Sequence, residues 1–421
     1  MTILFSLLLT VSAMLTVDNI NFTIADNEAT VTYSPDAKGV VTIPQTIRFK
    51  GATCPVVAIA DSAFYDVYEV TDITLPRSIR SIGGFAFFNT SINKPIYTKN
   101  VFAYLPFEYK GEYEIPKTIT EITAGAFCGC ADLTGVTLPK KLEKIGGYAF
   151  LGSGVTTPVM SDTHFAFLPT GHKGAFIIPD GITTIAAGAF FGCDELTRAD
   201  IPSSVTNIGE SAFRRCTSLD SVIISSSVTS INPYTFDGCR KLIYVVLPPQ
   251  IEVIGHHAFN ECSWLSRIDF SKTAIRSIED YAFYGCVALQ KITLQEGLTH
   301  IGTYAFNQCN DLNEINIPQS VTYVGNEAFE HTKINTPLFS KTVFIRLPES
   351  TTGTYTVPEG ITTIVDHAFS FCQRLEAIIL PSSVRTIGKG AFRFSSIRSI
   401  NIPEGVTVDD SAFEGCKYLK K

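Results

Sequence analysis

Cysteines at one repeating interval are the residues of this chain whose type could do nucleophilic or metal chemistry. The 421-residue sequence contains eleven Cys, and nine of them follow a phenylalanine by three positions. These nine are Cys130, Cys193, Cys216, Cys239, Cys262, Cys286, Cys309, Cys372 and Cys416. A fixed interval places each thiol at the same inward point of a repeated unit, where free Cys packs as a small apolar group. The spacing therefore predicts a structural ladder. A few disulfides between neighbouring coils are the alternative, because a coil spacing of about 4.8 Å is near the lower end of disulfide Cα separations.

The other candidates for catalysis or metal binding form no recognisable arrangement. The seven His are scattered, and His256-His257 occupies a variable turn in which an exposed spacer is expected. Cys128-Gly129-Cys130 is too closely spaced for a zinc site. The sequence has no H-E-x-x-H, G-x-S-x-G or P-loop motif, and its carboxylates are spread over turns. We therefore expect no catalytic residue, no metal and no cofactor, and we do not expect an enzyme.

The composition excludes two broad classes of protein. Apolar residues make up 45% of the chain and charged residues only 17%, which excludes a disordered protein. The 33 Lys and Arg are outnumbered by 40 Asp and Glu, for a net charge of −7. No basic stripe is present to follow a phosphate backbone, so nucleic acid is not an expected partner.

The elements that position the cysteines belong to a repeat built on a small residue followed by Phe. The fourteen aromatic members of this pair are Phe64, Phe87, Phe127, Phe150, Phe190, Phe213, Phe236, Phe259, Phe283, Phe306, Phe329, Phe369, Phe392 and Phe413. The dominant step between them is 23 residues, and three steps are 40 residues long. Fourteen units at one dominant step indicate a repeat array.

Residues 201–224 show how one unit leads into the next. The segment Leu219-x-x-Val222-x-Ile224 fits the leucine-rich repeat signature L-x-x-L-x-L, and its inward residues alternate with outward ones as in a half-buried strand. Pro202 and its equivalents end each strand, because Pro cannot donate to a ladder. One coil cannot bury its apolar side alone, so coils must stack. We predict a β-rich repeat solenoid of the leucine-rich repeat kind, a right-handed horseshoe or superhelix. Each coil of about 23 residues would contribute one short parallel strand, with turns or short helical segments on the other face.

The three 40-residue steps contain copies of one module. The copies lie near 98–116, 161–179 and 340–358, and each runs from F-x-x-L-P through Gly to a second Pro. Two strand-like runs around a Pro/Gly turn predict a shortened, hairpin-like coil that alters local curvature. A functional loop is the alternative, because Tyr104, Tyr109 and Tyr113 are expected to be exposed there.

The N-terminus predicts export. An apolar run over residues 3–11 precedes Val11-Ser12-Ala13, which fits a signal-peptidase site with cleavage after Ala13. No Lys or Arg precedes Lys38, and a buried first strand or short helix is the alternative. The run is too short to span a bilayer, which needs about 20 apolar residues. The expected organisation is a signal peptide at 1–13, an N-terminal β cap at 14–58 and the solenoid at 59–421.

The unit I-P-x-x-V-T-x-I-G-x-x-A-F-x-x-C-x-x-L, as in residues 201–219, resembles the BspA-like leucine-rich repeat family. The F-x-x-L-P module is also similar to one of that family. The resemblance covers residues 20–421 and implies a secreted or surface protein that takes part in adhesion to host cells and extracellular-matrix proteins. It implies no catalytic motif. Many members carry a C-terminal anchor, and this sequence has no recognisable one.

A partner would most simply bind the outward side chains of the strands. The expected protein-binding face is Ile223, Tyr244, Val246, Arg198, Arg267 and Asp269, with an apolar centre and charged flanks. Ordinary solvated strand faces are the alternative. The leading hypothesis is a secreted or surface adhesion protein whose partners are host or matrix proteins. An intracellular scaffold and an envelope component without a specific ligand are its rivals. The oligomeric state is open.

Overall fold

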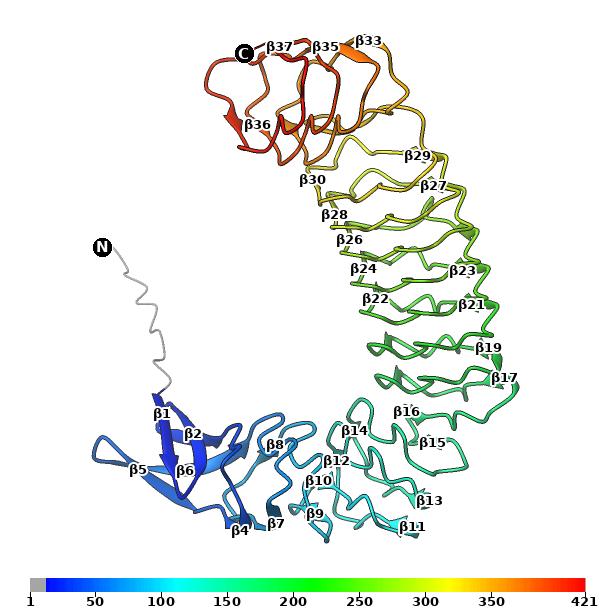
Figure 1. Ribbon diagram of the computed structural model, residues 1–421. Coiled ribbons are helices and arrows are strands. Elements are labelled where there is room, and N and C mark those ends of the chain that lie inside the picture. The colour runs from blue at the N-terminus through cyan, green and yellow to red at the C-terminus, as the bar shows by residue number, and fades with distance from the viewer. Residues whose placement is uncertain (1–12, 421) are drawn as a thin grey trace, which may run out of the picture. The chain divides into compact units, whose positions relative to one another are not determined.

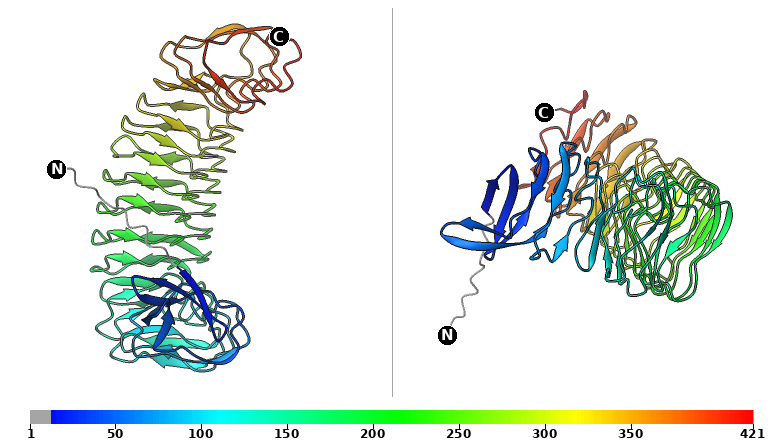
Figure 2. Two further views of the ribbon diagram at one scale, coloured as in Figure 1. Left: turned by 90° about the vertical axis from the view of Figure 1, so that its left-hand side faces the viewer. Right: turned by 90° about the horizontal axis from the view of Figure 1, so that it is seen from below.

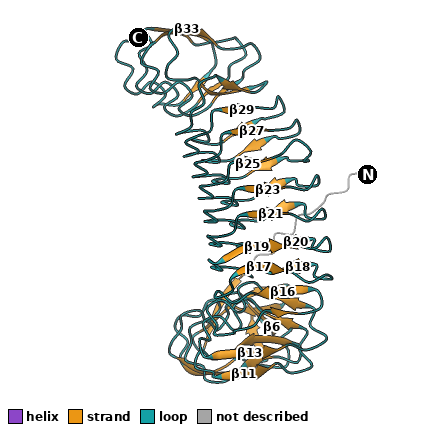
Figure 3. Ribbon diagram, turned by 90° about the vertical axis from the view of Figure 1, so that its right-hand side faces the viewer, coloured by secondary structure: helices purple, strands orange, loops and turns teal. Residues whose placement is uncertain are grey.

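The computed structural model describes residues 13–420, and the predicted leader at 1–13 lies outside this range apart from Ala13 (Figure 1). The described chain consists of strands and turns, without a helix (Figure 3). The predicted short helical segments are therefore wrong. Around every repeat Phe before Phe413 the backbone enters the left-handed region twice, for example at Ser211 (φ 55°) and Arg215 (φ 61°). Helical residues need negative φ throughout, so this conformation excludes a helix.

The chain divides into two compact units. One contains the described chain up to Pro169 together with Ile185–Ala189. The other contains Thr170–Thr184 and the chain from Phe190 onward. Each unit has stacked coils of its own.

Six strands precede the first coil of the first unit. They are β1 (Ala13–Val17), β2 (Ile20–Ala25), β3 (Glu28–Val31), β4 (Gly39–Thr42), β5 (Thr46–Phe49) and β6 (Ala52–Ile59). Strands β1, β2 and β3 pair antiparallel, and Phe22 on β2 is wholly buried beneath them. Parallel pairing begins where β3 joins β6. Strands β6 and β4 then pair in parallel with β8 (Ser81–Ile82) and β7 (Val70–Thr74) of the first coil. These two contacts cover the apolar edge of the first coil.

Two rows of parallel strands run through the coils. The first strand row comprises β7 (Val70–Thr74), β11 (Gly111–Glu114), β13 (Leu133–Thr137), β17 (Gly174–Ile177), β19 (Leu196–Asp200), β21 (Ser221–Ile223), β23 (Tyr244–Val246), β25 (Arg267–Ile268), β27 (Lys291–Thr293), β29 (Glu314–Asn316), β33 (Gly353–Thr356), β35 (Leu375–Ile379) and β37 (Ser399–Asn401). The second strand row comprises β8 (Ser81–Ile82), β12 (Glu121–Ile122), β14 (Lys144–Ile145), β18 (Thr184–Ile185), β20 (Asn207–Ile208), β22 (Ser230–Ile231), β24 (Val253–Ile254), β26 (Ser277–Ile278), β28 (His300–Ile301), β30 (Tyr323–Val324), β34 (Thr363–Ile364), β36 (Thr386–Ile387) and β38 (Thr407–Val408).

Within each sheet of the two rows, a strand pairs with its equivalent one coil away. Val222 lies opposite Val245 in the first row, and Ile231 lies opposite Ile254 in the second. The coils consequently stack in register, as the strands in Figure 2 show. This arrangement confirms the predicted β-rich repeat solenoid.

The repeat phenylalanines form the core between the two rows. Their rings stack face to face, with centroids 4.6 Å apart for Phe190 and Phe213 and 5.4 Å apart for Phe213 and Phe236. The stack continues through Phe329, and these rings are buried. Burying one such ring contributes about 1.5–3 kcal/mol. The 23-residue step is therefore the distance along the chain between successive rings of one stack.

The 40-residue steps contain antiparallel strand pairs. They are β9 (Ile96–Tyr97) with β10 (Val101–Tyr104), β15 (Val159–Met160) with β16 (His164–Phe167), and β31 (Leu338–Phe339) with β32 (Val343–Arg346). The first module still supplies a ring to the core, because Phe102 stacks on Phe127 at 4.9 Å. Its Leu105 takes the main-chain position of a repeat Phe, donating its N–H to the carbonyl of Ala126.

The expectation of exposed aromatics in the first of these modules is wrong for Tyr104. Its side chain is buried, and burial raises its pKa to about 12. Tyr109 and Tyr113 are half-buried and pack edge to face at 5.2 Å. All three rings therefore contribute to packing.

Candidate protein-interaction surface

The outward side chains of β21, β23 and β25 form one continuous surface. Strand register places Ser221 beside Tyr244 and Tyr244 beside Arg267. Two residues further along the same strands, at the next outward position, Ile223 lies beside Val246. Ile223 is 61% exposed, Tyr244 42% and Val246 46%. The structure thus brings four of the six residues of the expected face into direct neighbourhood.

The other two expected residues lie at the flanks. Arg198 on β19 is in register with Ser221, and its Nε donates to Asp200 Oδ1 at 2.6 Å. Asp269 is exposed just beyond the end of β25, where its Oδ1 accepts the N–H of Ser271 at 2.8 Å. This backbone hydrogen bond holds the pKa of Asp269 below its ordinary value. Arg267 forms no ion pair within the described residues and is free to meet a carboxylate.

The sequence reasoning missed two members of this surface, Trp264 and Ile243. Trp264 is 57% exposed and Ile243 is 42% exposed. The main-chain N–H of Trp264 donates to the carbonyl of Arg240, one coil back, which joins it to the coil of Tyr244. A signal was available, because this is the single Trp of the chain, in a position where neighbouring coils carry Lys241 and Ala288. We refer to Ile223, Ile243, Tyr244, Val246 and Trp264 as the central patch.

The cysteine ladder is largely shielded from solvent. All nine predicted ladder cysteines have free thiols, and all but the half-buried Cys416 are buried. Each thiol in the middle of the second unit donates to the main-chain carbonyl of the repeat Phe one coil earlier, as Cys216 does to Phe190 at 3.1 Å. Burial raises the pKa of Cys309 to about 12. A nucleophilic cysteine needs a lowered pKa and access, so these thiols are unsuited to catalysis.

A family model matches most of the chain. The BspA type leucine-rich repeat region matches in six copies over residues 45–106, 98–165, 163–273, 231–350 and 349–421. The chain belongs to the BspA type leucine-rich repeat family. This family is a protein-interaction scaffold rather than an enzyme family.

Solved structures similar to this BspA type chain come from several bacteria. A leucine-rich repeat protein from Bacteroides ovatus is 23% identical, with 96% of this chain and 93% of that chain covered and a TM-score of 0.40. A leucine-rich cell surface protein from Faecalibacterium prausnitzii is 24% identical, covering 97% and 87%, with a TM-score of 0.32. A leucine-rich repeat protein from Eubacterium ventriosum is 23% identical, covering 77% and 95%, with a TM-score of 0.47. No curated protein matches this chain.

The histidine pair is divided between two environments. His256 is exposed, but His257 is not the exposed spacer that the sequence predicts. Its ring is sandwiched between Tyr234 at 4.7 Å and Tyr281 at 4.6 Å. Desolvation in this stack lowers the pKa of His257. Across residues 13–420, no three His, Cys, Asp or Glu side chains are grouped to hold a metal.

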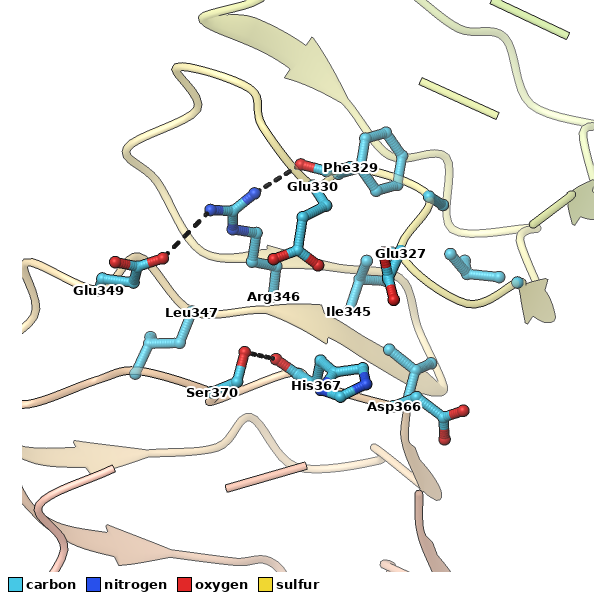
Figure 4. Close-up of a pocket in the computed structure, with 14 residues that line it drawn as sticks. Glu327, Phe329, Glu330, Ile345, Arg346, Leu347, Glu349, Asp366, His367 and Ser370 are labelled. Atoms are coloured by element: carbon cyan, nitrogen blue, oxygen red, sulfur yellow. Dashed lines mark hydrogen bonds and ion pairs between the residues drawn. The ribbon is translucent and has the colours of Figure 1, made fainter. Parts of the chain in front are cut away.

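A small cavity beside Arg346, in the third hairpin module, is lined by several charged side chains (Figure 4). Arg346 stands where the other two modules have Tyr104 and Phe167. Its guanidinium donates to the carbonyl of Phe329 and lies 4.0 Å from Glu349. The cavity volume is about 40 Å³. Because one water needs about 10–15 Å³ of such volume, this space suits a few water molecules rather than an organic substrate.

The described part of this family member includes no helix of sufficient length and apolarity to cross a membrane.

Proposed function

We propose that this chain is a secreted or cell-surface recognition protein that binds host or neighbouring-cell proteins, such as extracellular-matrix glycoproteins, without catalysis. The central patch makes the contact, and Arg198, Arg267 and Asp269 surround it. The observation that carries the proposal is this group of exposed large apolar side chains on a regular parallel sheet. Contiguous exposed apolar side chains with a polar rim are typical of protein-binding sites.

The chemistry of the patch supports a protein partner. Tyr, Trp and Arg are the side chains that most often dominate binding energy at protein interfaces. Tyr244, Trp264 and Arg267 supply one of each on adjacent coils. Tyr244 lies on β23, which pairs in register with β21 and β25, and Arg267 lies on β25, so hydrogen bonds between strands restrain the backbone under both side chains before binding. A preorganised surface loses little conformational entropy on association.

The intracellular scaffold remains a second candidate, favoured by one observation. The eleven cysteines are free, and oxidising compartments favour disulfides in secreted proteins. Ladder geometry supplies a different reason for free thiols, because the five from Cys216 to Cys309 are buried and each donates to a main-chain carbonyl. N-terminal sequencing of the native protein separates the two. Cleavage after Ala13 supports export, whereas an intact N-terminus on a protein confined to the cytosol overturns it.

Binding of the chain from Met14 onward to immobilised fibronectin, laminin and collagen, and to host cells, tests the partner class. We expect saturable binding to at least one of these surfaces, weakened at least tenfold in a Tyr244→Ala, Val246→Lys double variant. Thr293→Ala, an exposed outward position on β27, is the matched control and should bind normally. A flat response at micromolar protein, or equal binding by the double variant, would overturn the proposed face.

A further inference from the structure

A groove lies on the second strand row, on a different row of strands from the central patch. It is found where the sheet of β22 to β30 ends and the sheet that contains β32, β34, β36 and β38 begins. Within the described residues β30 and β32 are not hydrogen-bonded as neighbours, so the row is interrupted there. The groove has a volume of about 850 Å³. This volume is within the range of about 300–1,000 Å³ typical of small-molecule sites.

Tyr323 forms one wall of this groove. It lies on β30, the last strand of its sheet, and is 50% exposed. One ring face is stacked on His300 of the preceding strand, with centroids 4.5 Å apart and planes within 5°. His300 does not line the groove, whereas Tyr323 does. The second ring face is therefore the one presented to the groove, as a flat apolar platform with a polar hydroxyl at its edge.

A row of hydroxyl groups lines the opposite side. Thr363, Thr386 and Thr407 lie side by side in register on β34, β36 and β38. Within residues 13–420 their hydroxyls make no hydrogen bond, so each is available as both donor and acceptor. Neighbouring hydroxyls are separated by one strand spacing of about 4.8 Å.

Carboxylates and one ammonium complete the lining. Asp366 and Asp409 each use one oxygen to accept a main-chain N–H, from Lys389 at 2.7 Å and Ser411 at 2.9 Å. Their second oxygens remain available, as do both oxygens of the exposed Asp410. Lys389 forms no ion pair in the described part of the chain and adds a donor.

This combination selects among ligand classes. A metal ion needs carboxylates that converge on one point, and the described residues have no such group. The three carboxylates outnumber the one ammonium and repel an anionic ligand. A cationic side chain has donors but no acceptor, so it would leave the Lys389 ammonium without a partner. Scattered acceptors and donors opposite a free aromatic face suit a ligand that is both polyhydroxylated and flat. Its hydroxyls donate to carboxylates, and its C–H face packs on the ring.

We propose that this groove binds a neutral oligosaccharide, stacked on Tyr323 and hydrogen-bonded by Asp410 and the threonine row. The proposal is independent of the proposed protein-binding function, because the two sites lie on different strand rows and share no residue.

Titration of the chain from Met14 onward, which keeps β1 apart from its first residue, with soluble trisaccharides tests the proposal. The probes are cellotriose, maltotriose, xylotriose, mannotriose and chitotriose. Calorimetry and saturation-transfer NMR measure the binding of each. We expect saturable binding of at least one probe at millimolar concentration or below. Tyr323→Ala should weaken it roughly tenfold, equivalent to about 1.4 kcal/mol, and Asp410→Asn should also weaken it. Both residues are exposed, so thermal melting should be unchanged and should confirm that the variants fold.

Tyr244→Ala is the matched control, since Tyr244 is an exposed tyrosine of the central patch. It should leave sugar binding intact while weakening binding to matrix protein, and Tyr323→Ala should do the reverse. The proposal is overturned if no trisaccharide saturates the protein, or if both groove variants bind as well as the original chain. Tyr323-dependent binding of a lysine-rich peptide in place of every sugar would also overturn it.

Discussion

The thiol of Cys262 donates a hydrogen bond to the main-chain carbonyl oxygen of Phe236, one coil earlier, with Sγ and O 3.1 Å apart. The same carbonyl accepts the N–H of Cys239 from its own coil at 3.0 Å. Each carbonyl of this kind therefore joins two coils. A small side chain with one weak donor is what this position requires, and cysteine meets it without leaving a buried polar group unpaired.

The thiols should be almost unreactive in the native protein. Ten of the eleven are buried, and Cys416 is half-buried. We expect a thiol-exchange reagent such as DTNB to modify Cys416 alone at an appreciable rate in buffer. In denaturant all eleven should react. A denatured count below eleven under non-reducing conditions would reveal disulfides and contradict the free-thiol ladder.

Stability should fall at alkaline pH. Burial raises the pKa of Cys130, Cys193, Cys309 and Cys372 from 9.0 to about 12. Below pH 9 both states hold these protons, so the stabilisation is complete. Above pH 9 the unfolded chain releases them while the folded chain keeps them until about pH 12. The free energy of unfolding should then drop by about 1.4 kcal/mol per pH unit for each thiol.

Urea unfolding between pH 8 and pH 11 measures this slope. Removing one titrating group with Cys309→Ala should lower stability at pH 8 but flatten the dependence above pH 9. An unfolding free energy that stays constant up to pH 11 would contradict the raised pKa values of the buried thiols.

Ser153→Ala should stabilise the protein. Ser153 stands at the position of a ladder cysteine, and its Oγ is buried without a hydrogen-bond partner among the described residues. Removing a buried, unpaired hydroxyl gains about 1 kcal/mol. Thr90→Val is the control, because Thr90 Oγ1 donates a hydrogen bond to the carbonyl of Phe87 at 2.9 Å. Losing this hydrogen bond should lower the free energy of unfolding by a similar amount. Thermal melting should shift upward for Ser153→Ala and downward for Thr90→Val.

The phenylalanine stack should be most sensitive in its interior. Phe259 is wholly buried and stacked on both sides, at 5.3 Å from Phe236 and 5.2 Å from Phe283. Phe259→Ala should cost about 3–5 kcal/mol. Phe413 stacks on Phe392 and is half-buried, so Phe413→Ala should cost less. Chemical denaturation measures the free energy of unfolding of both variants. Equal losses for Phe259→Ala and Phe413→Ala would show that stacking on the second face of the Phe259 ring contributes nothing.

Much of the fold could be predicted from sequence because each coil repeats its spacing. Alternation within Leu219-x-x-Val222-x-Ile224 was enough to place Ile223 outward. The conformation around Phe213 was not foreseen, since Ser211 and Arg215 adopt positive φ although neither is glycine. Stacked main-chain hydrogen bonds between coils hold them there, as from the N–H of Arg215 to the carbonyl of Asp237. These hydrogen bonds between coils outweigh the preference of non-glycine residues for negative φ.

The candidate surfaces were harder to predict. Trp264 lies outside the strand pattern, so alternation carried no information about it. The groove beside Tyr323 depends on β30 and β32 failing to pair, which follows from how a hairpin module meets an ordinary coil. The F-x-x-L-P motif marked the position of the module, but the spacing did not predict that the strand row would be interrupted there. Periodicity predicted that Ile223, Tyr244 and Val246 on β21 and β23 point outward. It did not predict the shape of the surface around them.

The register of the coils also bears on how such a protein can change over generations. Phe213, Phe236 and Phe259 each meet the next coil through the same atoms, since each donates its N–H to the carbonyl of the small residue one coil on. A gene that loses or gains one block of 23 codons in this region therefore rejoins chemically equivalent partners. Unequal crossing-over can lengthen or shorten the array without designing a new junction. Outward side chains, which take no part in these bonds, can meanwhile diverge under selection by the partner.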